Sequence, residues 1–283
     1  MNVKYLIPLM ALLLISCNQQ DNGSQNSATP NIQTGSCNIG KWNSASLPLN
    51  LKISPEIAAD FYNDQTVGSV ANPINQMAKV WNDAISPGSN TALFKLPLTT
   101  GSGNGSDVLA NFRDGELGIY KSHTWFTNVS STALAITQFY GIIKSDPSLG
   151  TYIDLTHADI ILNYRNFGQD FSYTGNSFVD YDVPTVLLHE MGHFLGLCHE
   201  STYSSIMAPY YFTTQRTLKS FDTSKIRSLY LNNQNYGMSA IPQSKTALSA
   251  PVGSEVKGIV ELNANGHCKH YINGKLVYEH IQE

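Results

Sequence analysis

Three histidines fall within eleven positions of the stretch "VLLHEMGHFLGLCHESTYSSIMAPYY", residues 186–211. His189 and His193 are four residues apart, a spacing that puts both imidazoles on one face of a helix, close enough to bind one metal ion. Glu190 stands beside them and projects at an angle from the histidine face, where its carboxylate can reach a water held by the metal. The residue types therefore predict a metal site that also carries a carboxylate base.

A third histidine completes the pattern. Gly196 follows His193 by three residues, and His199 follows Gly196 by three. Because glycine can take the left-handed conformation that ends a helix, the chain can turn there and bring His199 back to the same point. Three neutral nitrogen ligands with a fourth position left for water describe a catalytic zinc site. The alternative is a core helix with incidental histidines, which does not account for the spacing of Gly196 and His199.

At this point the sequence resembles a family. "HEMGHFLGLCHE" fits the long zinc motif H-E-x-x-H-x-x-G-x-x-H of the metzincin metallopeptidases. Met207 resembles the methionine turn below the zinc in that clan, and Pro209 and Tyr211 fit the M-x-P-x-Y form of matrixins. The resemblance implies a zinc-dependent endopeptidase that hydrolyses peptide bonds of extended polypeptides, with Zn²⁺ as cofactor and Glu190 as catalytic base. Calcium sites are not assigned by the sequence.

Further segments resemble matrixin elements over about residues 41–231. "HADIILNY" is similar to the substrate-lining edge strand, so 158–163 are expected to pair with an extended peptide by β-augmentation. That resemblance makes Ala158 and Ile160 substrate-binding residues. Tyr211 is expected to line the pocket for the side chain after the scissile bond; the alternative is that it belongs to the core. Two departures stand out. Glu200 is the residue that astacins carry after the third histidine, but Pro209 replaces the astacin tyrosine ligand, so the matrixin form is favoured.

The elements that must position these residues are predicted by periodicity. Apolar residues alternate in 49–53 and 116–120, which predicts strands, and the runs 132–140 and 151–164 predict a hairpin. Helical spacing predicts helices at 72–85, from Pro184 through the histidine motif, and at 220–230. The metzincin resemblance implies an α+β fold. This fold has a twisted, mostly parallel sheet with an antiparallel edge strand, an active-site helix, a Met-turn subdomain and a small C-terminal β extension.

The N-terminal sequence predicts export. Lys4 precedes an apolar run that is too short to span a bilayer and is typical of a signal peptide. Leu14-Ile15-Ser16-Cys17 resembles a bacterial lipobox, which implies lipidation of Cys17 and anchoring to the cell envelope; the alternative is an ordinary secretory signal. The predicted segments are a signal peptide (1–16), a lipidated flexible tether (17–36), a catalytic domain (37–233), and a linker with a C-terminal β-hairpin (234–283).

Composition narrows the class of partner. The chain has 283 residues, a net charge of −4 and 13% charged residues, a balance that argues against nucleic acid as the main partner. We expect a monomer that acts on polypeptides and meets the membrane only through its lipid. The rival interpretations are a lipid-anchored protein that binds peptides without cutting them, and a structural zinc lipoprotein. Glu190 and the open coordination position speak against both.

Cysteines and one further histidine cluster leave alternatives open. With Cys17 lipidated, Cys37, Cys198 and Cys268 remain, which allows one disulfide and one thiol in an oxidising compartment. The pair is not determined, and the Cys37 thiolate could instead cap the zinc. "GHCKH", residues 266–270, resembles a metal cluster in composition but lacks a fourth ligand, so we expect solvated residues of a hairpin that turns at Asn273-Gly274.

Overall fold

The structure is a computed structural model that describes residues 40–147, 150–175, 181–200, 204–231 and 250–281. The predicted signal peptide and tether, together with Cys17 and Cys37, lie outside the described residues, as does the predicted linker up to residue 249. Among the helices that are described, none has the length and apolar character needed to cross a membrane.

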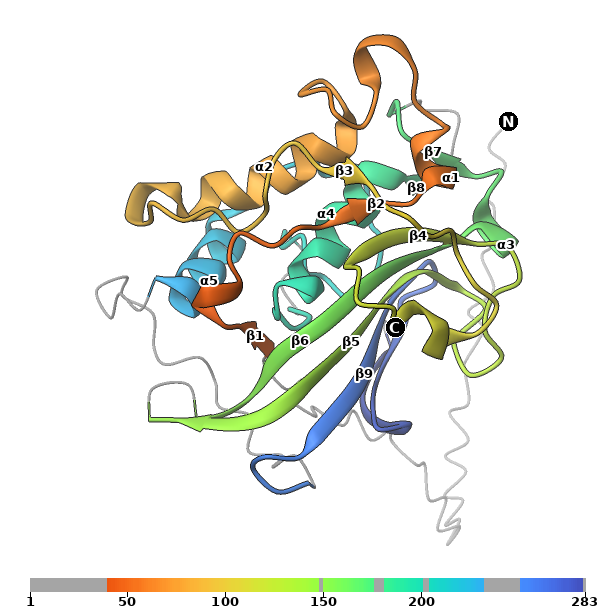
Figure 1. The fold of residues 1–283 in the computed structure, drawn as a ribbon. Coiled ribbons are helices and arrows are strands. Elements are labelled where there is room, and N and C mark those ends of the chain that lie inside the picture. The colour runs from red at the N-terminus through yellow and green to blue at the C-terminus, as the bar shows by residue number, and fades with distance from the viewer. Residues whose placement is uncertain (1–39, 148–149, 176–180, 201–203, 232–249, 282–283) are drawn as a thin grey trace, which may run out of the picture. The chain divides into compact units, whose positions relative to one another are not determined.

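One large sheet organises the described residues (Figure 1). Its strands follow the order β11-β10-β9-β5-β6-β4-β2-β3, and β1 also pairs with β6. The strands are β1 (Gly40–Trp42), β2 (Lys52–Ile53), β3 (Thr99–Thr100), β4 (Gly118–Ser122), β5 (Ala133–Asp146), β6 (Gly150–Asn163), β9 (Glu255–Asn263), β10 (His267–Ile272) and β11 (Lys275–Ile281), with β7 (Phe171–Ser172) and β8 (Tyr181–Asp182) paired separately.

Five α-helices accompany these strands in the described residues. They are α1 (Pro55–Ala58), α2 (Pro73–Ile85), α3 (Tyr164–Phe167), α4 (Val183–Phe194) and α5 (Ser220–Tyr230). Short 3-10 turns lie at Ser44–Ser46, Asn63–Gln65, Ser86–Gly88 and Leu109–Phe112. Helix α4 contacts β5 and β6, α2 packs on α4, and α5 packs on α2. The helices predicted at 72–85 and 220–230 therefore form, and both support the helix that carries the histidine motif.

The strand directions confirm the expected fold class. Strands β3, β2, β4 and β6 pair in parallel, β1 pairs in parallel with β6, and β5 pairs antiparallel to β6. The predicted hairpin of 132–140 with 151–164 is the β5–β6 pair. Beyond β5, the C-terminal strands β9, β10 and β11 continue the same sheet with antiparallel pairing.

The prediction that 158–163 form an edge strand is wrong. These residues end β6, which pairs with β5 on one side and with β4 on the other. Ile160 lies between Thr137 and Ile119, Ala158 is paired with Phe139, and both side chains are fully buried. Ile160 is paired on both sides and so has no free backbone groups for a substrate, and Ala158 is paired with β5 and fully buried.

Two tryptophans fix the position of α4 in the core. The indole Nε1 of Trp81 in α2 donates to the carbonyl oxygen of Leu188 at 3.0 Å, and Nε1 of Trp42 in β1 donates to that of Phe194 at 2.7 Å. Both indole rings are buried. Since a buried indole N–H needs a partner, these bonds hold α4 along its length while the rings supply apolar contact.

The C-terminal hairpin turns where the sequence predicts. Asn273 and Gly274 both have positive φ angles, 50° and 74°, between β10 and β11. Such angles are those of a type I′ turn, which Asn-Gly favours. Strand β9, which precedes this hairpin, pairs along the length of β5 (Figure 1). The hairpin is thus carried against the strand that neighbours α4.

Candidate metal centre

Helix α4 positions two of the three predicted ligands. The carboxylate of Asp182 caps its N-terminus by accepting from the N–H of Thr185 at 3.0 Å, and Pro184 occupies the first turn. All twelve residues of the helix are buried. A helix that is buried on every side explains why His189 and His193 stand in a largely apolar sequence.

Gly196 ends this helical segment as the sequence predicts. Its φ angle is +98°, and its carbonyl oxygen accepts from the N–H of Gly40 at 3.2 Å. A Cβ atom at this position would overlap the carbonyl group of Gly40. Glycine is therefore required twice here, for its left-handed backbone and for the close approach of β1. The turn directs the chain toward His199.

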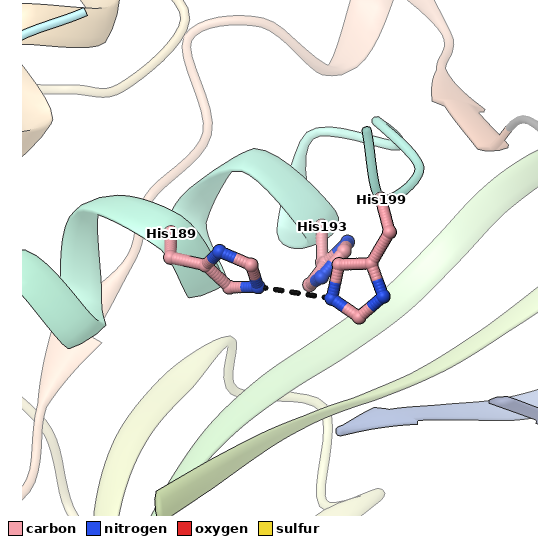
Figure 2. Close-up of side chains that lie close together, drawn as sticks. All are labelled: His189, His193 and His199. Atoms are coloured by element: carbon pink, nitrogen blue, oxygen red, sulfur yellow. Dashed lines mark hydrogen bonds between the residues drawn. The ribbon is translucent and has the colours of Figure 1, made fainter. Parts of the chain in front are cut away.

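The three histidines converge on one point (Figure 2). One ring nitrogen from each of His189, His193 and His199 lies within 4.8 Å of the others. The Nε2 atoms of His189 and His199 are 3.2 Å apart. Two nitrogens bound to the same tetrahedral zinc at about 2.0–2.1 Å would be separated by about 3.3–3.4 Å. The spacing therefore fits a shared zinc ion.

The opposite nitrogen of each ring has its own partner. Nδ1 of His189 contacts the carbonyl oxygen of Ile206 at 2.7 Å, and Nδ1 of His193 contacts that of Leu197 at 2.8 Å. Carbonyl oxygens only accept, so Nδ1 carries the proton in both rings and Nε2 keeps its lone pair. Such outer contacts orient histidine ligands and fix their tautomer.

Burial keeps the histidines neutral. It lowers the pKa of His189 to about 4, and burial together with the neighbouring histidines lowers the pKa values of His193 and His199 well below the ordinary range. Within the described residues, Nε2 of His193 has no hydrogen-bond partner although it is buried. A buried nitrogen with an unused lone pair is costly unless it coordinates a metal, so the residues present fit a zinc ion.

Glu190 lies at the same centre. Its carboxylate is fully buried, and Oε2 accepts a hydrogen bond of 2.6 Å from the hydroxyl of Thr137 in β5. Within the described part of the chain Oε1 has no partner. Burial raises the pKa of Glu190 to about 8, although the bond from Thr137 opposes that rise. A carboxyl group with one oxygen held and the other unused is suited to exchange a proton with a small molecule.

Met207 lies in a tight turn directly against α4. Its N–H donates to Oγ of Ser205 at 3.0 Å, and its carbonyl oxygen accepts from the N–H of Glu200 at 2.8 Å. A Cβ atom on Gly192, which lies between the two helical histidines, would overlap Sδ of Met207. Asp222 of α5 holds the turn by accepting from Oγ of Ser205 at 2.5 Å.

Tyr211 lies beside the histidine cluster. Together with His189 and Ile206 it lines a cavity, and its hydroxyl accepts from the N–H of Asp182 at 3.0 Å. Leu262 of β9 lines the same cavity. Of the three residues predicted to bind substrate, Tyr211 lines this cavity, and Ala158 and Ile160 do not.

Sequence reasoning missed three residues that contact the site: Thr137, Asp222 and His270. Thr137 is a polar residue in an otherwise apolar strand, a signal that could have drawn attention to it. His270 of β10 is 2% exposed, and its Nε2 lies 2.6 Å from Nδ1 of His199. His270 therefore contacts Nδ1 of His199, just as carbonyl oxygens contact Nδ1 of the other two ligand histidines.

The expectation of solvated residues in "GHCKH" is wrong for two members. Cys268 is buried and His270 nearly so, because β9 carries the hairpin onto the site. His267 instead pairs with Glu279 at 2.5 Å on the neighbouring strand. No disulfide joins Cys198 to Cys268. A bond from either to Cys37 stays a prediction, since Cys37 lies outside the described residues. His157 pairs with Asp159, away from the metal cluster.

Comparison with known proteins agrees with this geometry. Residues 109–231 match the matrixin family of peptidases. A segment of 71 residues is 37% identical to interstitial collagenase from Equus caballus, which amounts to 25% of this chain and 15% of the collagenase. The chain thus spans a small part of that relative's length. The fold and the histidine cluster thus agree with a similarity to the matrixins over residues 109–231.

Proposed function

We propose that the chain is a zinc-dependent endopeptidase. The observation that carries this proposal is the convergence of three neutral histidines around one point, with the buried carboxyl group of Glu190 alongside. The match of residues 109–231 to the matrixin family of peptidases supports it. In this proposal His189, His193 and His199 hold the zinc, and Met207 supports them from below.

The chain's own residues account for the proton transfers. A bound zinc ion supplies Lewis-acid polarisation of the scissile carbonyl and lowers the pKa of a coordinated water. Glu190 acts as the base through Oε1, since Thr137 holds Oε2. The same carboxyl group then delivers the proton to the leaving amine.

The substrate is proposed to be an extended polypeptide. Strand β5 passes the site, because Thr137 in its middle touches Glu190. A peptide that took the place of β9 on the side of β5 opposite β6 would lie next to the histidines with its backbone paired. The proposed location is the bacterial cell envelope, with a lipid on Cys17 as the anchor. Metabolic labelling with palmitate tests this: we expect label on the parent and none on Cys17→Ser.

A peptide library with mass-spectrometric readout tests the activity. The zinc-loaded chain is expected to cleave internal peptide bonds, and a chelator such as 1,10-phenanthroline abolishes the cleavage. Glu190→Gln keeps zinc but loses activity by about 10²–10⁴-fold, the usual contribution of general acid–base catalysis. Asp83→Asn is the matched control, because it makes the same change on an exposed carboxylate of α2.

Two results would contradict the proposal. Cleavage that survives complete removal of zinc would exclude the metal, and full activity in Glu190→Gln would exclude the assigned base. Zinc content measured by atomic absorption in each variant separates loss of the base from loss of the metal.

A further inference from the structure

Strand β9 runs along the side of β5 that faces away from β6. It pairs antiparallel with β5, from Ile142 opposite Glu255 to Ala133 opposite Asn263. Val260 stands opposite Thr137, the residue whose hydroxyl binds Glu190. The C-terminal segment therefore fills the strand position next to the proposed base.

The end of β9 is also bound on its other side. Tyr210 and Asn263 form a parallel bridge, and the N–H of Tyr211 donates to the carbonyl oxygen of Asn263 at 3.3 Å. The segment after the Met207 turn and strand β5 thus enclose this part of the chain from two sides. A peptide strand held between two protein segments by backbone pairing is the arrangement of strand-addition binding.

The side chains of β9 also make contacts of the kind that a bound peptide would make. Leu262 is 2% exposed and lines the cavity beside His189 and Tyr211. Its neighbours are held by polar contacts: Glu261 accepts from the N–H of Ser130 at 3.0 Å, and Asn263 accepts from the hydroxyl of Thr132 at 2.7 Å. An aliphatic side chain therefore forms part of the cavity wall, and the flanking residues anchor the strand.

The following strand closes over the metal centre. Strand β10 pairs with β9, with His270 opposite Val260, and this register places the His270 ring against His199 with 4.5 Å between ring centroids. Cys268 is buried between the two segments, where its Sγ donates to the carbonyl oxygen of Glu261 at 3.0 Å. Both the strand position and the histidine cluster are thus covered by residues 255–281.

We propose that the C-terminal segment 255–281 is an intramolecular occupant of the peptide-binding cleft and keeps the chain latent. Strand β9 takes the place of a substrate, with Leu262 as the side chain that lines the cavity beside His189. This inference rests on the proposed peptidase function.

Displacing Leu262 tests the inference. In the zinc-loaded chain, Leu262→Asp places a carboxylate at a position that is 2% exposed and should release β9, raising hydrolysis of an exogenous peptide library at least tenfold. Leu262→Ala disturbs the fold less and should raise hydrolysis of the peptide library by a smaller factor. Val252→Asp is the control, since it makes the same change at an exposed position just before β9 and should leave activity as in the parent.

A structural role of β9 predicts the opposite result. If the strand serves only to complete the sheet, Leu262→Asp and Leu262→Ala lower hydrolysis in step with the free energy of unfolding. A fall in activity in both variants would overturn the inference.

A binding assay separates this inference from the peptidase proposal. The probe is a fluorescein-labelled peptide with the sequence of residues 255–264, EVKGIVELNA, added to chains that carry Glu190→Gln. Fluorescence anisotropy should detect binding when Leu262→Asp is also present and none in Glu190→Gln alone. Binding without hydrolysis by Leu262→Asp would support occupancy of the cleft and refute the peptidase. A folded Leu262→Asp chain that neither binds nor cleaves would overturn the inference.

Discussion

Replacing Gly196 by alanine should destabilise the metal centre more than any ordinary surface substitution. A φ angle of +98° costs a residue with a Cβ atom about 1–3 kcal/mol, and the overlap with the Gly40 carbonyl adds about 1–3 kcal/mol of overpacking. The expected loss in the free energy of unfolding is therefore about 2–6 kcal/mol. The overlap involves backbone atoms, so β1 must move away from the turn.

Gly115→Ala is the matched control. Gly115 has a similar φ angle of +89°, but a Cβ atom there would meet nothing within 4 Å. Urea denaturation of the two metal-free variants then separates backbone strain, common to both, from the close approach that only Gly196 makes. The difference between them should be about 1–3 kcal/mol.

Zinc affinity provides the second assay for Gly196→Ala. The turn at Gly196 sets the path to His199, so a displaced backbone should weaken zinc binding about tenfold or more in competition with a chelating dye. Gly115→Ala should bind zinc as the parent does. The reasoning is refuted if Gly196→Ala loses no more stability than Gly115→Ala and binds zinc equally well.

Two further predictions concern buried polar contacts. Thr137→Val removes the hydroxyl that holds Oε2 of Glu190 and should lower kcat about 10–100-fold in the Leu262→Asp background, whereas Thr137→Ser keeps the donor and most of the activity. Burial raises the pKa of Asp159 to about 6. Burial lowers the pKa of His157, but the hydrogen bond from His157 to Asp159 outweighs this effect, so the pKa of His157 is also raised. The folded chain then holds more protons than the unfolded chain near pH 4–6, so stability falls as pH rises through about 6. Between pH 4 and 8, the free energy of unfolding of the parent should fall by up to about 3 kcal/mol more than that of Asp159→Asn, as measured by urea titration. A difference between the two proteins that stays constant over this pH range would refute the assignment.

The local geometry of the site could be predicted from the sequence. The four-residue spacing of His189 and His193 places both rings on one helix face whatever the helix packs against. The positive φ angle at position 196 requires glycine, and the turn at Gly196 returns His199 to the other two histidines. Asn273 and Gly274 similarly determine their turn through their own φ angles. These features depend on residues a few positions apart, so periodicity and glycine placement are enough to find them.

The neighbours of each strand could not be predicted in the same way. Residues 158–163 have an apolar pattern that fits an edge strand or an interior one, and only the pairing with β4 and β5 shows that they are interior. The nearly unbroken apolar run "ADIIL" is typical of a strand buried on both faces, a signal that favours the interior position. Alternation records which face of a strand is buried, but not which strands lie beside it.

The sequence by itself determined the zinc-type motif, the helix that carries it and the turn that completes it, because each follows from interactions within about a dozen residues. Only the tertiary structure decided that β9 lies against β5 and that His270 touches His199, which is 71 positions earlier in the chain. The physical reason is that backbone hydrogen bonds between strands are the same for every sequence. The packing of the whole sheet therefore decides which strand pairs with the side of β5 that faces away from β6. That choice in turn decides whether the site is open or covered.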